Sequence, residues 1–294
     1  MTSDSTCVTS SGSVSKLMGA AGIALVSAVG FAGVASAQAP TKVKAHYDVT
    51  FSGVTIGRFN YVSSFDGRRY RIDADAKARL LLGALSWKGN IDASGRVVDG
   101  QPVPTAFSQE FRSKRKLFLK TKKKTKAAKL TFRRGNLVDA DLQPPRKTHN
   151  RAPLRPKHTR GVLDPASAVV ALTMPQKRGD PCRRRLKVFD GRMRFDLRVS
   201  QKRKQNLTLN DGRQVRAIVC GVKYVPIAGH KLKDDGNKRL QRPGAIEFSL
   251  RPVAGGTLYV PHEVRVKTGA GTARLTARRV DITMRGRDPI ALTN

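Results

Sequence analysis

The side chains that most often perform catalysis or bind metals are few and scattered in this chain of 294 residues. None of its five histidines lies at metal-ligand spacing from another. The sequence contains no Gly-x-Ser-x-Gly turn, no His-Glu-x-x-His motif and no glycine-rich phosphate loop. Asp73 and Asp75 share one strand face, a spacing more typical of solvated carboxylates than of a general acid–base pair. The sequence therefore predicts a protein that is not an enzyme and holds no metal or other cofactor.

The N-terminal segment has the pattern of an export signal. An apolar run from Leu17 to Val34 follows a single lysine, Lys16, and ends at Ala35-Ser36-Ala37, whose small residues suit cleavage after Ala37. An uncleaved membrane anchor is the alternative, since the run is about as long as a membrane span. We expect a signal peptide over residues 1–37 and a periplasmic chain over residues 38–294, folded as a single domain.

Two cysteines, Cys182 and Cys220, remain after the predicted cleavage. An exported protein with two cysteines favours a disulfide, because the compartment is oxidising. A pair of buried free thiols is the alternative.

The chain carries 57 Lys and Arg against 21 Asp and Glu, a formal net charge of +36. A charge this large repels itself and is most easily tolerated beside a polyanion. Nucleic acid would be the default partner in the cytoplasm, but the export signal disfavours it. We therefore expect an anionic envelope polymer or an anionic lipid surface as partner, with an envelope protein as a further candidate.

The most basic tract runs over residues 112–134 and contains no acidic residue. In one interpretation, two strands hold its cations at fixed spacing against an anionic surface, and in the other the charge only prevents pairing at a sheet edge. We expect Lys122–Lys126 at a hairpin tip, between strands that contain Leu117–Leu119 and Leu130–Phe132. The candidate anion-binding residues are Arg112, Lys114, Arg115, Lys116, Lys120, Lys122, Lys123, Lys124, Lys126 and Lys129.

The elements that must position these residues are mostly strands. Asp-Gly pairs, which suit tight hairpin turns, occur at 66–67, 99–100, 190–191, 211–212 and 235–236. Strand-like alternation surrounds them, as in Met193–Val199, where apolar side chains face one way and charged ones, including Arg194 and Asp196, face outward. Further strands are expected over residues 215–225, 245–250, 257–266 and 272–284. Asp164-Pro165 predicts the start of a short helix over residues 165–173, and the proline-rich, basic stretch at about 143–160 predicts an exposed connection.

Three short motifs resemble an exported bacterial family, domain of unknown function 3108. They are the opening strand Tyr47–Gly53 with Ile56-Gly57 after it, the Asp164–Ser167 helix start, and Val188–Gly191 leading into Arg194–Leu197, with the Gly255–Thr257 region beyond. The resemblance implies a mainly β fold of the cell envelope: an antiparallel sheet curled into an incomplete barrel or spiral. It brings no catalytic residue. From the residues themselves, Gly53 and Gly57 are expected to bracket a connection where a side chain would clash.

The favoured hypothesis is a non-catalytic periplasmic protein that supports the cell envelope by binding an anionic component or a protein partner. The alternative is a lipid-binding or carrier protein that uses the concave face of the sheet. In that case the apolar segment Leu80–Trp87 is the expected cavity lining, although it could equally be ordinary core.

Overall fold

The computed structural model of this chain describes residues 40–117, 120–174, 180–209, 212–253 and 258–293. These residues belong to one compact unit. The predicted signal peptide and the Gly255–Thr257 region lie outside the described residues. No helix in the described part of the chain is long and apolar enough to cross a membrane.

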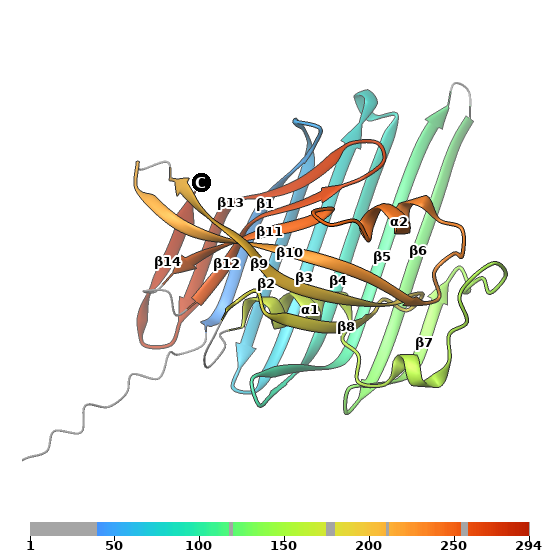
Figure 1. The fold of residues 1–294 in the computed structure, drawn as a ribbon, viewed down its shortest axis with the longest axis horizontal. Helices are drawn as coiled ribbons and strands as arrows, with labels where there is room; N and C mark the ends of the chain where they lie inside the picture. Colours follow the sequence, from blue (N-terminus) through green and yellow to red (C-terminus); the bar gives the residue numbers. More distant parts are fainter. Residues whose placement is uncertain (1–39, 118–119, 175–179, 210–211, 254–257, 294) are drawn as a thin grey trace, which may run out of the picture. The chain divides into compact units, whose positions relative to one another are not determined.

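The unit is built mainly from strands, as the alternating pattern predicted (Figure 1). The strands of the first half are β1 (Pro40–Phe51), β2 (Val54–Asp66), β3 (Arg69–Leu80), β4 (Leu85–Val98), β5 (Gln101–Leu117), β6 (Lys120–Arg133) and β7 (Asn136–Gln143). Those of the second half are β8 (Arg184–Phe189), β9 (Arg194–Thr208), β10 (Gln214–Ala228), β11 (Ile246–Val253), β12 (Leu258–Lys267), β13 (Thr272–Met284) and β14 (Arg287–Thr293). The helices are α1 (Pro165–Thr173), α2 (Asp235–Leu240) and two short 3₁₀ turns, η1 (Leu81–Gly83) and η2 (Pro156–Thr159).

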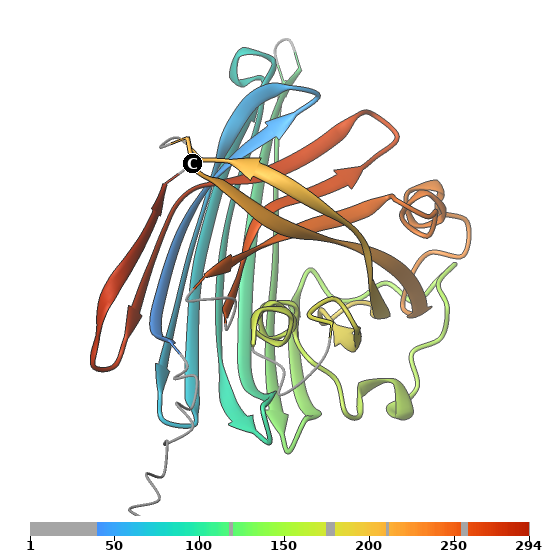
Figure 2. The same cartoon turned by 60° about the vertical axis from the view of Figure 1, so that its left-hand side comes forward.

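All fourteen strands form one antiparallel sheet, in the order β7-β6-β5-β4-β3-β2-β1-β13-β12-β11-β10-β9-β8, with β14 pairing the C-terminal part of β13. The pairing of β1 with β13 joins the two halves of the chain. The sheet has two ends, β7 and β8, that do not pair with each other. Figure 2 shows β8–β12 curving over the inner face of β1–β6. The predicted antiparallel sheet, curled into an incomplete barrel, is confirmed.

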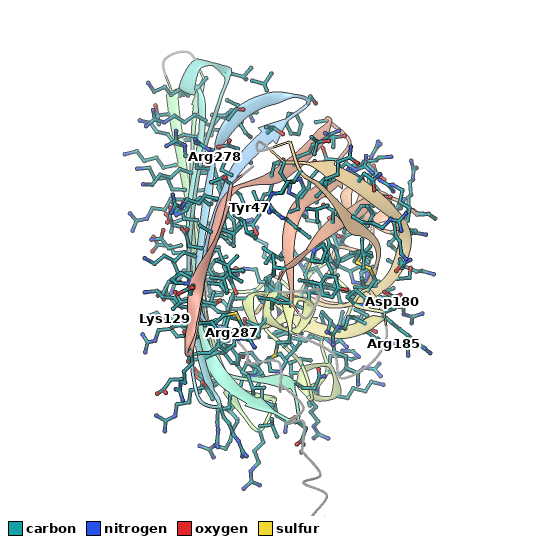
Figure 3. The ribbon with its side chains drawn as sticks, turned by 90° about the vertical axis from the view of Figure 1, so that its left-hand side faces the viewer. Tyr47, Lys129, Asp180, Arg185, Arg278 and Arg287 are labelled. Carbon is teal, nitrogen blue, oxygen red and sulfur yellow. A yellow bond between two sulfur atoms is a disulfide. The ribbon has the colours of Figure 1, made fainter. Side chains whose placement is uncertain are left out.

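The inner face of the sheet carries the apolar side chains, because successive residues of a strand point to opposite faces. On β3, for example, Tyr70 and Ile72 are buried while Arg69 and Arg71 are exposed. Figure 3 shows the same division, with Tyr47 inside and Lys129 on the outer side. The outer face of the sheet is therefore strongly cationic and its inner face forms the core.

Helix α1 lies inside the curl and contacts β4, β5, β8 and β12. The helix is apolar almost all round, as expected for an element enclosed by a sheet. The carboxylate of Asp164 caps it by accepting hydrogen bonds from the backbone N–H groups of Ala166 and Ser167, both at 2.9 Å. The predicted helix at 165–173 is confirmed with its predicted cap.

The Asp-Gly turns are confirmed at three positions in the described residues. Gly67, Asp99, Gly100 and Gly191 have positive φ and connect adjacent strands. At 211–212 only Gly212 is described, and its φ is also positive. The turn predicted at Asp235-Gly236 is wrong, because Asp234 accepts a hydrogen bond from the Asn237 backbone N–H and starts helix α2 there instead.

Two other local predictions need correction. The clash predicted at Gly57 is confirmed, because a Cβ there would overlap the Lys77 carbonyl oxygen. A Cβ at Gly53 would meet nothing within 4 Å, so there the positive φ of 89°, and not a clash, requires glycine. Arg194 and Asp196 do form an ion pair, at 2.7 Å, but their side chains are only 7% and 14% exposed. The pair is therefore buried, and not solvated on an outer face as predicted. Most residues of the connection predicted at about 143–160 are exposed. Backbone hydrogen bonds of Ala152 with Gly229 and His230 attach it to the chain after β10.

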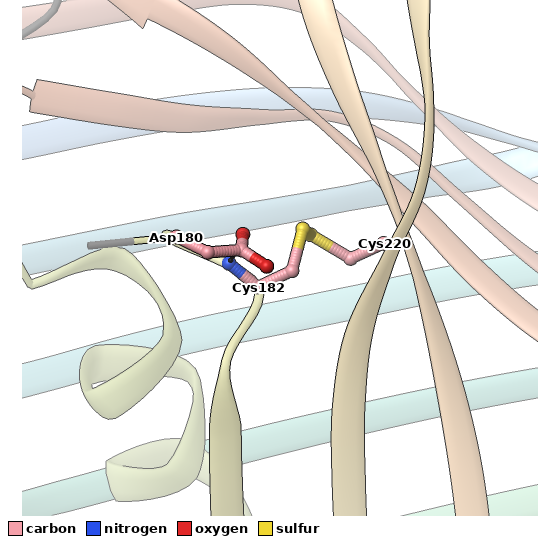
Figure 4. The surroundings of a disulfide bond; sticks show 3 residues. All are labelled: Asp180, Cys182 and Cys220. Atoms are coloured by element: carbon pink, nitrogen blue, oxygen red, sulfur yellow. Dashed lines mark hydrogen bonds between the residues drawn. A yellow bond between two sulfur atoms is a disulfide. The ribbon is translucent and has the colours of Figure 1, made fainter.

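Cys182 and Cys220 form a disulfide (Figure 4). Cys182 precedes β8 and Cys220 lies in β10, with their Cα atoms 5.4 Å apart and both residues fully buried. The Cys182 backbone N–H also donates to the Asp180 carboxylate at 2.8 Å. The bond belongs to the same core cluster as Val199, Val222 and Phe248, so it fastens the second half of the sheet from within.

Candidate functional site

An apolar cavity of about 410 Å³ lies inside the curl of the sheet. Its lining comes from β1, β2 and β9–β13 and from one side of α1. The cavity lies between two core clusters, one built around β1, β12 and β13 and the other around the disulfide. Its volume is within the range of about 300–1,000 Å³ that is common for small-molecule sites.

The chemistry of the cavity wall is uniform. Val43, Ala45, Val222 and Phe248 are typical of the lining, and α1 adds Leu172. Among the described residues, no charged side chain lines the cavity, and its polar side chains are one serine, one threonine and three tyrosines. Such a surface can bind an apolar chain through burial alone, at about 0.8 kcal/mol per methylene group, and it offers no paired nucleophile and base.

Two tyrosines of the wall, Tyr47 and Tyr61, are held neutral by burial. The Tyr47 hydroxyl donates a hydrogen bond to the Pro261 carbonyl at 3.1 Å. Burial raises the pKa of Tyr47 well above its ordinary range, and burial raises the pKa of Tyr61 to about 12. Both groups therefore keep their protons at any physiological pH, and the cavity remains uncharged.

A buried polar network holds α1 against the first half of the sheet. Ser167 is hydrogen-bonded both to the Asp164 carboxylate and, at 2.6 Å, to the Tyr70 hydroxyl. All three residues are at most 2% exposed, and none lines the apolar cavity. The role of Ser167 in positioning the helix was not predicted, since its partner Tyr70 is 97 residues away in the sequence.

This network makes a pH-dependent contribution to stability. Burial raises the pKa of the Asp164 carboxyl to about 6, while the hydrogen bonds from Ser167 and Ala166 oppose the shift. A carboxyl with a raised folded pKa binds its proton more tightly in the folded state. Its stabilising contribution is therefore complete below the unfolded pKa of about 4 and is lost as the pH rises through about 6.

We expect the Asp164→Asn variant, which keeps a capping oxygen without the charge, to lose this dependence. The difference in unfolding free energy between wild type and variant should fall by about 2–3 kcal/mol from pH 4 to pH 7. Urea unfolding at each pH measures it, with Asp73→Asn as a control that removes an exposed carboxylate of the outer face. A constant difference across this range would contradict the account.

The predicted anion-binding residues occupy the β5–β6 hairpin, and all ten are exposed. The predicted tip at Lys122–Lys126 is wrong: these residues lie within β6, and the segment Leu117–Leu119 falls partly outside the described residues. The cations also do not form one row. The register places Arg115, Lys120, Lys122, Lys124 and Lys126 on the inner face, and Arg112, Lys114, Lys116, Lys123 and Lys129 on the outer face.

The two rows differ in their surroundings. On the outer face Arg112 forms an ion pair with Glu110 at 2.5 Å, and Lys129 lies across from Asp141 of β7. Among the described residues, no inner-row cation forms an ion pair. All five inner-row cations therefore have no ion-pair partner among the described residues, and on the outer row the same holds for Lys114, Lys116 and Lys123.

The apolar segment Leu80–Trp87 was expected in the cavity or in the core, and neither expectation is correct. None of its residues lines the apolar cavity. Leu81 is 72% exposed and Trp87 is 37% exposed. The segment forms the β3–β4 turn with η1 and lies beside the C-terminal end of β5, where Leu85 pairs with Arg115 (Figure 1). No group of three or more potential metal ligands is found in the described part of the chain.

Comparison with known proteins finds one family and one solved structure that this chain resembles. The chain matches the family described as Protein of unknown function (DUF3108) over residues 46–278. It is also similar to the crystal structure of a beta-barrel-like protein of domain of unknown function DUF1849 from Brucella abortus, with 13% identity and a TM-score of 0.46, covering 84% of this chain and 99% of that chain. The search among curated proteins finds no match. Since the family match spans well over half of its residues, the chain belongs to the DUF3108 family of proteins of unknown function.

Proposed function

We propose that this protein is a non-catalytic periplasmic protein that binds lipid, with an acyl chain held in the apolar cavity under α1. The single observation that carries this proposal is the cavity itself, whose described lining is free of charged side chains. A packed concave face would have left no room for a ligand. Of the two functions that the sequence suggested, the cavity favours the lipid-binding one.

The wall of the cavity suits a flexible chain better than a polar metabolite. A polar ligand would lose its hydrogen bonds to water and recover few here, at a cost of about 1–3 kcal/mol for each unpaired group. An acyl chain has no such groups and gains from every methylene it buries. An extended apolar ligand is therefore the chemistry that this site recognises.

The experiment is mass spectrometry of the full chain after expression in a Gram-negative host and purification from the periplasmic fraction. We expect an intact mass that begins at Gln38, and a lipid released on denaturation in an amount approaching one per protein. A protein that keeps residues 1–37 would contradict the predicted cleavage, and a protein absent from the periplasmic fraction would contradict the periplasmic part. Protein that carries no lipid, and binds no fluorescent fatty acid after delipidation, would contradict the lipid-binding part.

Binding to an anionic envelope component is a second candidate, supported by one observation. The register places Arg115 directly opposite Lys122, and Lys114 directly opposite Lys123. Like charges in such pairs destabilise a sheet, whereas a bound anion would compensate them. This surface lies outside the lining of the apolar cavity, so the two functions are compatible in one molecule.

A further inference from the structure

Near η1, the inner face of β4, β5 and β6 carries a regular set of side chains that do not line the apolar cavity. We call this surface the inner tip face. The paired strands place three residues in each row across it. The rows are Leu85–Arg115–Lys122, Trp87–Ser113–Lys124 and Gly89–Phe111–Lys126. The apolar side chains of β4 therefore share one face of the sheet with the cationic side chains of β6, and β5 lies between them.

The aromatic part of this face consists of two packed rings and not of a lone exposed side chain. The Trp87 and Phe111 rings are stacked, with centroids 5.1 Å apart and planes at 21°. The Phe111 ring lies over Gly89, where any Cβ would overlap it. The absence of a side chain at Gly89 thus leaves room for the Phe111 ring, and Trp87 remains 37% exposed.

Beside the stacked rings is a second hollow of about 410 Å³, with a mixed lining. Its apolar wall is Leu80, Leu85 and Trp87, and its cationic wall includes Arg115, Lys122 and Lys124. The neighbouring turns at this end of the sheet expose Leu81, at 72%, and Val54, at 66%. Apolar and aromatic groups next to uncompensated cations match the boundary between acyl chains and phosphate headgroups, where tryptophan and basic residues concentrate.

We propose that this inner tip face docks the protein on an anionic phospholipid bilayer, with Trp87 at the level of the headgroups and Arg115, Lys122 and Lys124 against the lipid phosphates. The inference deepens the second candidate function by naming the anion, and it is independent of the acyl cavity. It also accounts for the exposed segment Leu80–Trp87. An anionic bilayer is favoured over an apolar protein partner as the occupant of this face, because an apolar partner would leave the charges of Arg115 and Lys122 uncompensated.

Trp87 is the only tryptophan of the chain, so its fluorescence reports this face alone. The test mixes the mature protein with vesicles of phosphatidylcholine containing about a third phosphatidylglycerol, and with pure phosphatidylcholine vesicles. We expect a blue shift of the emission, and quenching by phospholipids brominated on the acyl chain, only with the anionic vesicles and at low salt. An unquenched Trp87 on vesicles that do bind protein would overturn the proposal.

Two charge-matched triple variants separate docking by this face from general attraction. The first is Arg115→Gln, Lys122→Gln, Lys124→Gln on the inner face, and the second is Lys88→Gln, Lys116→Gln, Lys123→Gln on the outer face of the same strands. Each cation near an anionic surface contributes about fivefold to partitioning. We expect the inner variant to lose about 100-fold in vesicle binding and the outer variant to lose less than tenfold.

Equal losses in the two variants would overturn the proposal and leave general anion binding in place. The docking face would also be wrong if the protein binds soluble lipopolysaccharide or a polyanion tightly but binds anionic vesicles no better than neutral ones. Absence of binding to every anion would overturn both the docking face and the second candidate function. The circular dichroism and urea midpoint of each variant confirm that it is folded.

Discussion

Replacing Ala45 with phenylalanine is expected to prevent acyl-chain binding while the protein stays folded. Ala45 is 2% exposed, lies on the inner face of β1 and lines the cavity. A benzyl group there would point into existing empty space, so it would occupy volume that a ligand needs. Displacing about three methylene groups of the ligand costs about 2–3 kcal/mol, or a 30- to 150-fold weaker Kd.

Titration of delipidated protein with a fluorescent fatty acid measures this loss. Leu172→Trp, which fills the cavity from α1, should have the same effect through a different element. Val138→Phe is the matched control, since it adds the same ring to β7 at a position that is 53% exposed. If both filling variants are folded and bind the probe as tightly as wild type does, the cavity is not the binding site.

The second large effect is expected from removal of the disulfide. In the chain-entropy account, closing a loop with a sequence separation of 38 residues stabilises the folded state by about 3–4 kcal/mol. We expect the Cys182→Ala, Cys220→Ala variant to lose this amount in urea unfolding. Alanine is the suitable replacement because both positions are fully buried and a serine hydroxyl would add an unpaired polar group.

The same variant should also bind the acyl probe more weakly. The disulfide packs in one cluster with Val199, Val222 and Phe248, and all three of these residues line the cavity. Loosening the cluster therefore loosens the cavity wall. Reduction of the wild-type protein should reproduce both losses. An unfolding midpoint that is unchanged by reductant, with both thiols open to alkylation in the folded protein, would contradict the assignment.

Local features of this fold were predictable because short-range chemistry determines them. Asp99-Gly100 forms a two-residue hairpin turn because both residues adopt positive φ, and Asp164 caps α1 through contacts within three residues. The failure at Asp235-Gly236 is of the same kind: the preceding Asp234 offers a competing helix cap, which a search for Asp-Gly pairs ignores.

The site was not predictable in the same way, because it depends on pairings far apart in the sequence. The cavity forms only when β1 pairs with β13, which joins residues near 45 to residues near 280. Apolar residues of ordinary strands then face empty space, and nothing in their local pattern distinguishes them from core. The segment Leu80–Trp87 shows the opposite case: its apolar run forms a turn at the end of the sheet, where Leu81 is 72% exposed and Trp87 is 37% exposed.

The basic tract shows a third limit. Its composition is evident from the sequence, but the division of its cations between two faces depends on the register of β5 with β6. A hairpin tip at Lys122–Lys126 predicts a different register from the one that the two strands adopt. A shift in register by one residue moves every side chain to the other face. Composition can therefore indicate an anionic partner, while only the paired structure shows that Arg115, Lys122 and Lys124 share a face with Trp87.

The most direct test of the lipid-binding account is to locate a bound chain. Delipidated mature protein with labelled methyl groups is titrated with a ¹³C-labelled fatty acid, and contacts between ligand and protein methyls are measured by NMR. The account predicts contacts from the chain to Val169 and Leu172 of α1 and to Val222 of β10, which line the cavity from two different elements. Contacts confined to the tip around Leu85, or binding with no contact to these three residues, would contradict it.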